Sequence, residues 1–422
     1  MTTVTGVKEK ISCCAFCGSK NLFPILDFGN VGLAGSFLEK KELAHEKKYR
    51  LRLVFCRDCF AVQVIDKIPP TIFFQNYFYF SSAISTLKSH FEDYANEVVE
   101  RFIPSEDAVV LEIGCNDGVL LKPIADMQVS TIIGVDPAKN VISTINDDRI
   151  IVVNDYFSES LAVELRDKHG AANIIMANNV FAHINDISAV TRAIKSMLSF
   201  NGVFVFEVHY LGNIIDNNQY DMVYHEHIYY YSISSLLKHF SRHSMCLFDV
   251  KLVPTHGGSI RGFVCKDTSK YTKFKSTMLS SLIEKERKEN YNKDVFFRGF
   301  AARIHKLRDE LLFCLKKFKK KGNVIVGYGA SGRANTILQF CKIDGQLIDY
   351  MIDDAPAKHG FYTPGTHLEI KSSDVLTGRN KPDIVVIFAW FFRSEIMNRH
   401  KNFTTNGGTF IVPLPSIEII QG

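Results

Sequence analysis

The 422-residue sequence lacks the features that would mark a membrane, secreted or nucleic-acid-binding protein. No apolar run approaches the roughly 18 residues needed to cross a bilayer. No charged segment followed by an apolar stretch opens the chain, as in a secretory signal. The net charge is only +5 and is spread along the chain, which is too weak to indicate a nucleic-acid partner. We therefore expect a cytoplasmic protein without membrane or nucleic-acid partners.

Disulfides are not expected either, because ten cysteines in a reducing compartment indicate metal ligation or burial. Two Cys-x-x-Cys pairs are present: Cys14 with Cys17, and Cys56 with Cys59. Two such turns can close a tetrahedral zinc site, and four thiolates fill its coordination shell. We expect a structural zinc ion in a small domain of residues 1–70, with an unmetallated pair of turns as the alternative.

A strand, a glycine turn and the start of a helix follow one another around residues 111–118. Gly114 and Gly118 permit a sharp turn close to a ligand. Glu112 and Asp117 would repel a phosphate, whereas they would attract the sulfonium and amino group of S-adenosylmethionine (SAM) and accept from its ribose. The stretch therefore predicts a SAM site, with an unliganded glycine turn as the alternative.

Strands and helices alternate from this turn onward, which predicts a doubly wound α/β domain over residues 71–268. Polar residues follow successive strands, where ligands bind in this fold. Asp136 ends the second strand and is placed to accept hydrogen bonds from ribose hydroxyls. The expected cofactor-binding residues are Glu112, Gly114, Asn116, Asp117, Gly118, Asp136, Asp155, Asn178 and Asn179.

Two histidines, a glutamate and four tyrosines lie within residues 224–232. His225 and His227 are two positions apart and do not share a helical face, so the pattern disfavours a metal site. An imidazole oriented by a carboxylate or phenol is the usual general base at neutral pH, and a partly buried His-Tyr interface is the alternative. The aromatic residues 73–82 predict either a core plug between domains or the wall of a pocket.

The C-terminal part repeats the strand, turn and helix at residues 323–336, which predicts a second Rossmann-like domain over residues 269–422. Its GxGxxG pattern is a weak dinucleotide signal, because such a turn can hold any pyrophosphate at a helix N-terminus. Asp353 ends the following strand, and Lys358 adds a cation in the next loop.

Together these landmarks resemble the sugar C-methyltransferases, SAM-dependent enzymes that methylate C3 of nucleotide-linked 4-keto-deoxysugars. The resemblance covers nearly the whole chain. It rests on the paired Cys-x-x-Cys motifs and on residues 81–82, 112–118, 224–227, 256–259, 327–329 and 335–336. It implies an α/β chain with a zinc-binding domain, a central class I SAM methyltransferase domain, and a C-terminal Rossmann-like domain that helps to form the nucleotide-sugar cleft.

By this resemblance His227 is the base, Tyr224 and Glu226 assist it, and either Tyr77 or Tyr79 lies in the same pocket. We also include His225 in the catalytic set. The expected substrate-binding residues are His256, Ser259, Arg261, Tyr328, Gly329, Ser331, Arg333, Asn335 and Lys358.

The implied reaction removes the C3 proton of a 4-keto-6-deoxyhexose, carried on dTDP or GDP, and methylates the resulting carbanion. An NAD-dependent nucleotide-sugar oxidoreductase is an alternative that leaves the acidic turn and residues 224–227 unexplained. A zinc-ribbon nucleic-acid-binding protein is another, which the basic residues of 1–70 leave open, but the interleaved aromatics of a stacking platform are sparse there. We expect a monomer.

Overall fold

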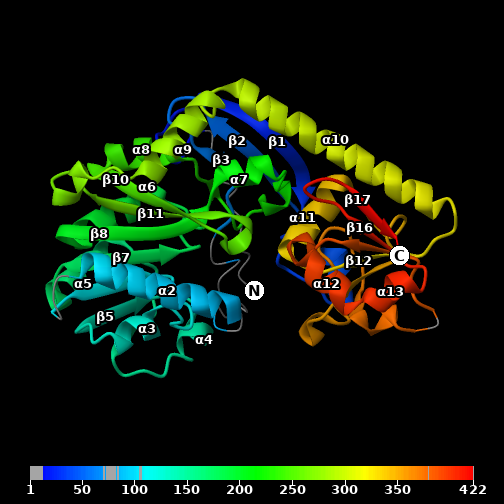
Figure 1. Cartoon of the computed structure of the whole chain (residues 1–422), viewed down its shortest axis with the longest axis horizontal. Coiled ribbons are helices and arrows are strands. Elements are labelled where there is room, and N and C mark those ends of the chain that lie inside the picture. Colours follow the sequence, from blue (N-terminus) through cyan, green and yellow to red (C-terminus); the bar gives the residue numbers. More distant parts are fainter. Residues whose placement is uncertain are drawn as a thin grey trace.

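The computed structural model describes residues 13–69, 72, 82, 85–103, 107–378 and 380–421. Tyr77 and Tyr79 lie outside the described residues, and so does Ser81. Figure 1 shows two α/β lobes, one formed by the central part of the chain and one by its C-terminal part. The N-terminal sheet and the long helix α10 (Asp294–Lys319) connect the two lobes at the top of that view.

The N-terminal sheet is antiparallel and has the order β1-β2-β3-β9. Its strands are β1 (Leu22–Val31), β2 (Tyr49–Cys56), β3 (Val62–Val64) and β9 (Tyr229–Tyr230), and the 3-10 helix η1 (Lys40–His45) lies between the first two. Alternate residues of a strand face the same side, so Leu51, Leu53 and Phe55 enter one core together. The last strand comes from the central part of the chain, directly after the histidine-rich segment.

The central sheet has seven strands in the order β10-β11-β8-β7-β4-β5-β6, and only β11 runs in the direction opposite to the other six. The strands are β4 (Val109–Ile113), β5 (Thr131–Val135), β6 (Ile150–Val153), β7 (Ala172–Asn178), β8 (Leu198–His209), β10 (Met245–Val253) and β11 (Ser259–Lys266). The strand order reverses at β4, where a doubly wound sheet binds its ligand.

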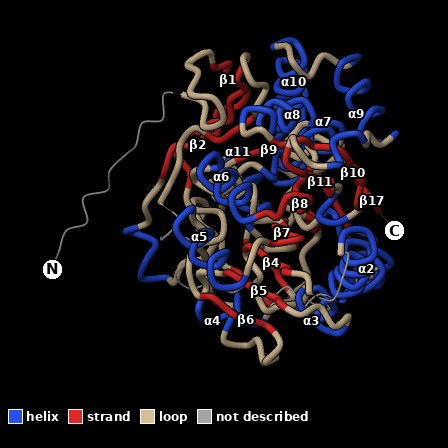
Figure 2. Tube along the Cα trace, turned by 90° about the vertical axis from the view of Figure 1, so that its left-hand side faces the viewer, coloured by secondary structure: helices blue, strands red, loops and turns tan. Residues whose placement is uncertain are grey.

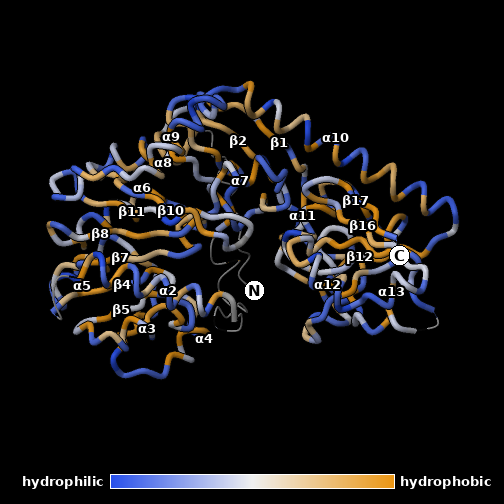
Figure 3. The backbone as a smooth tube through the Cα atoms, viewed as in Figure 1, coloured by the Kyte–Doolittle hydropathy of each residue, from blue (hydrophilic) through white to orange (hydrophobic). Residues whose placement is uncertain are grey.

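Helices cover both faces of this sheet (Figure 2). They are α2 (Ser85–Phe102), α3 (Leu121–Asp126), α4 (Lys139–Ile142), α5 (Glu159–His169), α6 (Ile187–Met197), α8 (Ile233–Arg242) and α9 (Thr277–Lys288). The short helix α7 (Leu211–Asp216) packs instead in the core that contains the N-terminal sheet. Within β4, Leu111 and Ile113 pack with residues of α5 and α6, and Val110 packs with residues of α2 and α3. Both faces are buried, which explains why these strands are continuously hydrophobic (Figure 3). The predicted doubly wound α/β fold is confirmed.

The C-terminal sheet repeats this architecture in the order β14-β13-β12-β15-β16-β17, with only β17 antiparallel. Its strands are β12 (Ile325–Tyr328), β13 (Tyr350–Asp353), β14 (Ile370–Ser372), β15 (Ile384–Ile387), β16 (Thr409–Val412) and β17 (Glu418–Gln421). The α-helices are α11 (Gly332–Cys341), α12 (Arg393–Arg399) and α13 (Lys401–Thr405). The second Rossmann-like domain is also confirmed.

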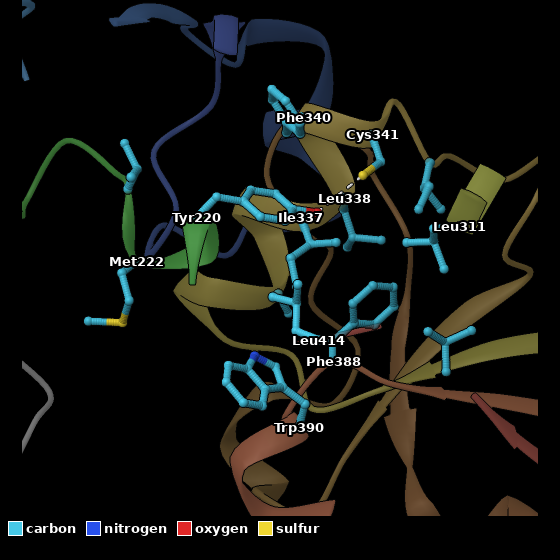
Figure 4. Close-up of a cluster of buried hydrophobic side chains, with 14 of the residues drawn as sticks. Tyr220, Met222, Leu311, Ile337, Leu338, Phe340, Cys341, Phe388, Trp390 and Leu414 are labelled. Carbon is cyan, nitrogen blue, oxygen red and sulfur yellow. Dashed lines mark hydrogen bonds between the residues drawn. The ribbon is translucent and has the colours of Figure 1, made fainter. Parts of the chain in front are cut away.

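One hydrophobic core joins the N-terminal sheet, α10 and the C-terminal sheet. The 3-10 turn η3 (Tyr220–Met222) of the central part enters this core (Figure 4). Tyr220 lies beside α11, and its hydroxyl is 3.4 Å from the Cys341 Sγ. Residues from all three parts of the chain therefore pack in one core. The predicted domain boundaries at residues 70 and 268 stay predictions. In the described part of the chain, no helix is long and apolar enough to cross a membrane.

Tyr220→Ala is expected to lower the thermal unfolding midpoint, because deleting a buried aromatic side chain costs about 3–5 kcal/mol. Circular dichroism measures this midpoint. Phe313→Ala is the matched control, since Phe313 lies on α10 and is 72% exposed. Equal midpoints for the two variants would contradict the packing role of Tyr220.

Candidate active site

The four predicted metal ligands lie together. The Sγ atoms of Cys14, Cys17, Cys56 and Cys59 are all within 4.8 Å of one another. Cys14 and Cys59 are 3.4 Å apart at sulfur, and Cys17 and Cys56 are 3.6 Å apart. Four thiolates at about 2.3 Å from one zinc ion would be separated by about 3.8 Å, so the donor set and the spacing fit a structural zinc site. Gln63 supports the cluster by donating to the Cys14 Sγ over 3.1 Å.

The cysteine turns pack directly against the segment that follows His227. The Val64 amide donates to the Ile228 carbonyl at 2.8 Å, and Val62 pairs with Tyr230. Phe16, between two of the cysteines, meets the Tyr229 ring edge-on at 5.1 Å. The cysteine cluster therefore helps to position the histidine segment without supplying a reactive metal centre.

Cys14→Ser is expected to lose bound zinc and to lower the thermal unfolding midpoint, because three thiolates no longer close the tetrahedral site. Cys13→Ser is the matched control, since Cys13 adjoins the cluster and is not one of the four grouped ligands. Elemental mass spectrometry should find one zinc ion in the wild type and in the control. Zinc retained by Cys14→Ser would refute the assignment.

The predicted SAM turn has a backbone conformation that requires glycine at residue 114. Gly114 has φ = 71°, and a Cβ there would lie 2.3 Å from the Val180 Cγ2. Asp136 accepts from the Asn116 amide at 3.0 Å with Oδ2 and from the Ala138 amide at 2.8 Å with Oδ1. Asp136 thus holds the turn in shape from the neighbouring strand, in addition to any contact with a ribose.

Buried acceptors without partners surround this turn. The Glu112 Oε1 accepts from the Asn178 Nδ2 at 3.1 Å, whereas the Glu112 Oε2 has no hydrogen-bond partner among the described residues. The same holds for Asp117 Oδ1 and for the side-chain oxygens of Asn178 and Asn179. Burial raises the pKa of Glu112 to about 8, with smaller contributions from Asp136 and Asp117. Unmet acceptors and negative charge suit a cationic ligand with hydroxyl donors, which is the chemistry of SAM.

The predicted cofactor-binding residues differ in how far their side chains are buried. Asp155 follows β6 and is exposed, with its carboxylate accepting from the Tyr156 amide at 2.7 Å. Asn179 adopts φ = 55° directly after β7. The individual roles of these residues toward SAM stay predictions.

SAM binding at pH 7 should release up to about one proton from Glu112, because a cationic ligand favours the carboxylate over the protonated form. Titration calorimetry in two buffers of different ionisation heat measures this release. Glu112→Gln should abolish it, and Glu164→Gln, which alters an exposed carboxylate on α5, should not. Identical heats for the wild type in both buffers would contradict the raised pKa.

His227 is buried and held by hydrogen bonds on both ring nitrogens. Its Nδ1 donates to the Met222 carbonyl at 3.1 Å, and its Nε2 lies 2.8 Å from the Tyr224 hydroxyl. A carbonyl can only accept, so the neutral ring carries its hydrogen on Nδ1, and Nε2 is the basic nitrogen that accepts from the Tyr224 hydroxyl. Burial holds the pKa of His227 well below its usual value, and the neighbouring His183 and His209 add to this effect.

Tyr224, Glu226 and His225 occupy different surroundings. The Tyr224 ring lies 4.1 Å from the His227 ring, centre to centre. Glu226 reaches the N-terminal segment: a Cβ built on Gly35 would lie 3.0 Å from the Glu226 Oε1. Burial raises the pKa of Glu226 to about 7. His225 turns to β2 and its Nε2 donates to the Arg50 carbonyl at 2.9 Å. A catalytic role of His225 stays a prediction.

Two histidines beside His227 were absent from the predicted site. The His183 ring meets His227 edge-on at 4.9 Å, and the His209 ring lies 5.2 Å away. Burial lowers the pKa of His183 to about 4. His183 follows β7 and His209 ends β8, so their place at the carboxyl edge of adjacent strands is the sequence signal that identifies them.

The predicted substrate residues on β11 are engaged inside the protein. The Arg261 Nη2 lies 2.6 Å from the Glu207 Oε1, and its Nη1 lies 2.6 Å from the Glu97 Oε2. Ser259 donates to the Thr255 carbonyl at 3.1 Å. The backbone of His256 belongs to the 3-10 turn η4 (Thr255–Gly257). Arg261 is thus neutralised by the chain's own carboxylates, and its contact with a substrate stays a prediction.

The loop of η4 lies against the C-terminal domain, since a Cβ on Gly257 would be 2.3 Å from the Phe391 Cζ. The predicted substrate residues of that domain gather around the start of α11. Ser331 caps the helix by accepting from the Ala334 amide, and Asn335 donates to the Ala34 carbonyl at 2.6 Å. Lys358 donates to the Ala330 carbonyl at 2.8 Å and to Asp353 at 3.0 Å.

The other predicted residues of this loop have partners as well. The Tyr328 hydroxyl donates to Asp354 at 2.8 Å, and burial raises the pKa of Tyr328. Gly329 has φ = 90° and faces Ala389 so closely that a Cβ would meet it at 2.4 Å. The Arg333 Nε donates to Asp221 at 2.8 Å. The structure brings these residues to one loop region, and their contact with substrate stays a prediction.

Three family models match the chain in order. They are described as "Putative zinc binding domain" over residues 14–74, "Methyltransferase domain" over residues 87–243 and "C-methyltransferase C-terminal domain" over residues 254–415. With the strand order of the central sheet, these matches define the chain as a class I SAM-dependent methyltransferase.

Relatives extend the match to the whole chain. The C-methyltransferase NovU of Streptomyces niveus is 29% identical over 98% of this chain and 98% of its own length. A ubiquinone biosynthesis O-methyltransferase of Azorhizobium caulinodans is 31% identical over 24% of this chain and 40% of its own. The matched C-terminal model and this full-length relative bear out the resemblance to the C-methyltransferases.

A solved SAM-dependent methyltransferase from Anabaena variabilis is similar at a TM-score of 0.32 and 14% identity, over 43% of this chain and 95% of that one. The strand order, and not this likeness, carries the fold assignment. Neither the oxidoreductase nor the nucleic-acid-binding alternative accounts for the three matched models in this order.

Proposed function

We propose that this chain transfers a methyl group from SAM to C3 of a nucleotide-linked 4-keto-6-deoxyhexose, carried on dTDP or GDP, in the biosynthesis of a branched deoxysugar. The observation that carries the proposal is the buried His227, whose Nδ1 donates to the Met222 carbonyl and whose Nε2 accepts from the Tyr224 hydroxyl. Methylation at carbon requires a carbanion, which forms where a base removes a proton beside a carbonyl. A buried, uncharged imidazole of fixed tautomer is suited to that step.

The proposed step keeps its charges in balance. His227 Nε2 takes the C3 proton, the C–H electron pair becomes the enolate, and the ring becomes an imidazolium whose Nδ1–H still donates to the Met222 carbonyl. The Tyr224 hydroxyl, now released from Nε2, can donate to the developing enolate oxygen. SAM, when bound, supplies the electrophilic methyl carbon. The C4 ketone acidifies the protons on C3 and C5 alike, so the position of His227 decides which of the two carbons loses its proton.

The remaining assignments follow from this step. We propose that Glu226 acts as a carboxylate toward a sugar hydroxyl, and that the loop around Tyr328, Gly329 and Ser331 holds the nucleotide. Glu112, Asp117 and Asp136 would face SAM. The zinc ion is structural. We further propose a cytoplasmic monomer without nucleic-acid or membrane partners, which light scattering of the purified chain tests for oligomeric state.

Mass spectrometry should find a gain of one methylene unit when the chain is incubated with SAM and a 4-keto-6-deoxyhexose on dTDP or GDP. His227→Asn should lower turnover by about 100-fold or more, because general bases contribute roughly 10²–10⁴-fold. The matching 4-hydroxy sugar should not react. Methylation of that sugar would instead indicate transfer to oxygen.

The pH dependence of kcat/KM separates Glu226 from His227. The wild-type value should fall as the pH drops below about 7, where Glu226 takes up a proton. Glu226→Gln removes this group, so the fall should move below pH 6.5, because the pKa of His227 is held well below that value. Identical profiles for both proteins would contradict the role of Glu226 as a carboxylate.

A further inference from the structure

The turn η3 links the C-terminal domain to His227 through three consecutive residues. Tyr220 is inserted beside α11, as Figure 4 shows. Asp221 is completely buried. The Met222 carbonyl accepts from the His227 Nδ1 and from the Tyr230 hydroxyl, both at 3.1 Å. The acceptor that orients the base therefore lies one residue from a buried carboxylate.

Two side chains of the C-terminal domain converge on one oxygen of that carboxylate. The Asp221 Oδ2 lies 2.8 Å from the Arg333 Nε and 2.7 Å from its Nη2. The Trp390 Nε1 donates to the same oxygen at 2.9 Å. The Arg333 guanidinium also lies 3.9 Å from the centre of the Phe391 ring. These contacts hold the arginine fork in one orientation, and loss of either partner would leave a buried charge uncompensated.

We infer that Arg333 is a positioning residue, which acts through Asp221 to fix the Met222 carbonyl and thereby the tautomer and orientation of His227. Asp221 and Met222 are consecutive residues of η3, so a shift of Asp221 displaces the Met222 backbone and with it the carbonyl. Without that acceptor, the ring can carry its hydrogen on Nε2, where it cannot take a proton from substrate. This role differs from the predicted contact of Arg333 with the nucleotide sugar. The kinetic part rests on the proposed function.

Arg333→Gln and Asp221→Asn test the inference in the full chain. Both should lower kcat on the order of 10- to 100-fold, the scale expected when a base is misplaced by about 1 Å, with little change in KM. The double variant should lose no more than either single one, because both act through one contact. The inference would be overturned in favour of substrate binding by one pattern of kinetics. In that pattern Arg333→Gln raises KM and leaves kcat unchanged, while Asp221→Asn has the kcat and KM of the wild type.

Nitrogen NMR of ¹⁵N-histidine-labelled protein reads the ring directly and needs no substrate. Wild-type His227 should show hydrogen on Nδ1, and both variants should gain a signal for hydrogen on Nε2. An unchanged tautomer in both variants would refute the inference. If no sugar is methylated by the wild type, the proposed function fails while this spectrum still decides the positioning role.

Two further variants separate positioning from unfolding. Arg393→Gln breaks an exposed pair in the same domain, between Arg393 and Glu418 at 2.7 Å, and should match the wild type in kcat and tautomer. Trp390→Phe removes one of the two side chains that donate to Asp221 and should shift the tautomer less than Arg333→Gln does. If Arg333→Gln does not fold, an unshifted tautomer in folded Trp390→Phe refutes the inference.

Discussion

The hydrogen bond from the His227 Nδ1 to the Met222 carbonyl is the constraint on which the rest of the site depends. It fixes one tautomer of a buried, neutral ring and leaves Nε2 as the basic atom. All three parts of the chain contribute to this arrangement. The N-terminal sheet pairs with β9 just after His227, the central sheet supplies His183 and His209, and the C-terminal domain encloses η3.

The charges of the site divide between its two sides. The turn after β4 gathers Glu112, Asp117 and Asp136, with buried oxygens that lack partners among the described residues. The loop after β12 carries Ser331 at the start of α11 and Lys358 nearby. An acidic side favours the cationic methyl donor, and a helix N-terminus favours an anionic carrier. This division would suit the proposed transfer of a methyl group from a cationic sulfonium to a nucleotide-linked substrate.

Much of the fold could be predicted because its signals are local. Cysteine spacing identifies the metal cluster, and apolar strands with glycine turns identify both Rossmann-like sheets. Contacts set by pairing between distant strands could not be predicted this way. Arg261 pairs with Glu207 across β11 and β8, a contact between distant strands that no local pattern of the sequence indicates. The two-residue strand β9 is too short for a periodic signal, and η3 gains its partners only through tertiary packing.

Proton exchange at the reacting carbon tests the central claim most directly. The 4-keto nucleotide sugar is incubated with the chain in D₂O, with S-adenosylhomocysteine in place of SAM, and followed by proton NMR. A neutral His227 placed at C3 predicts loss of the C3 proton signal while the C5 signal persists, and His227→Asn should abolish this loss. Exchange no faster than in buffer alone, or equal exchange at C3 and C5, would contradict the account.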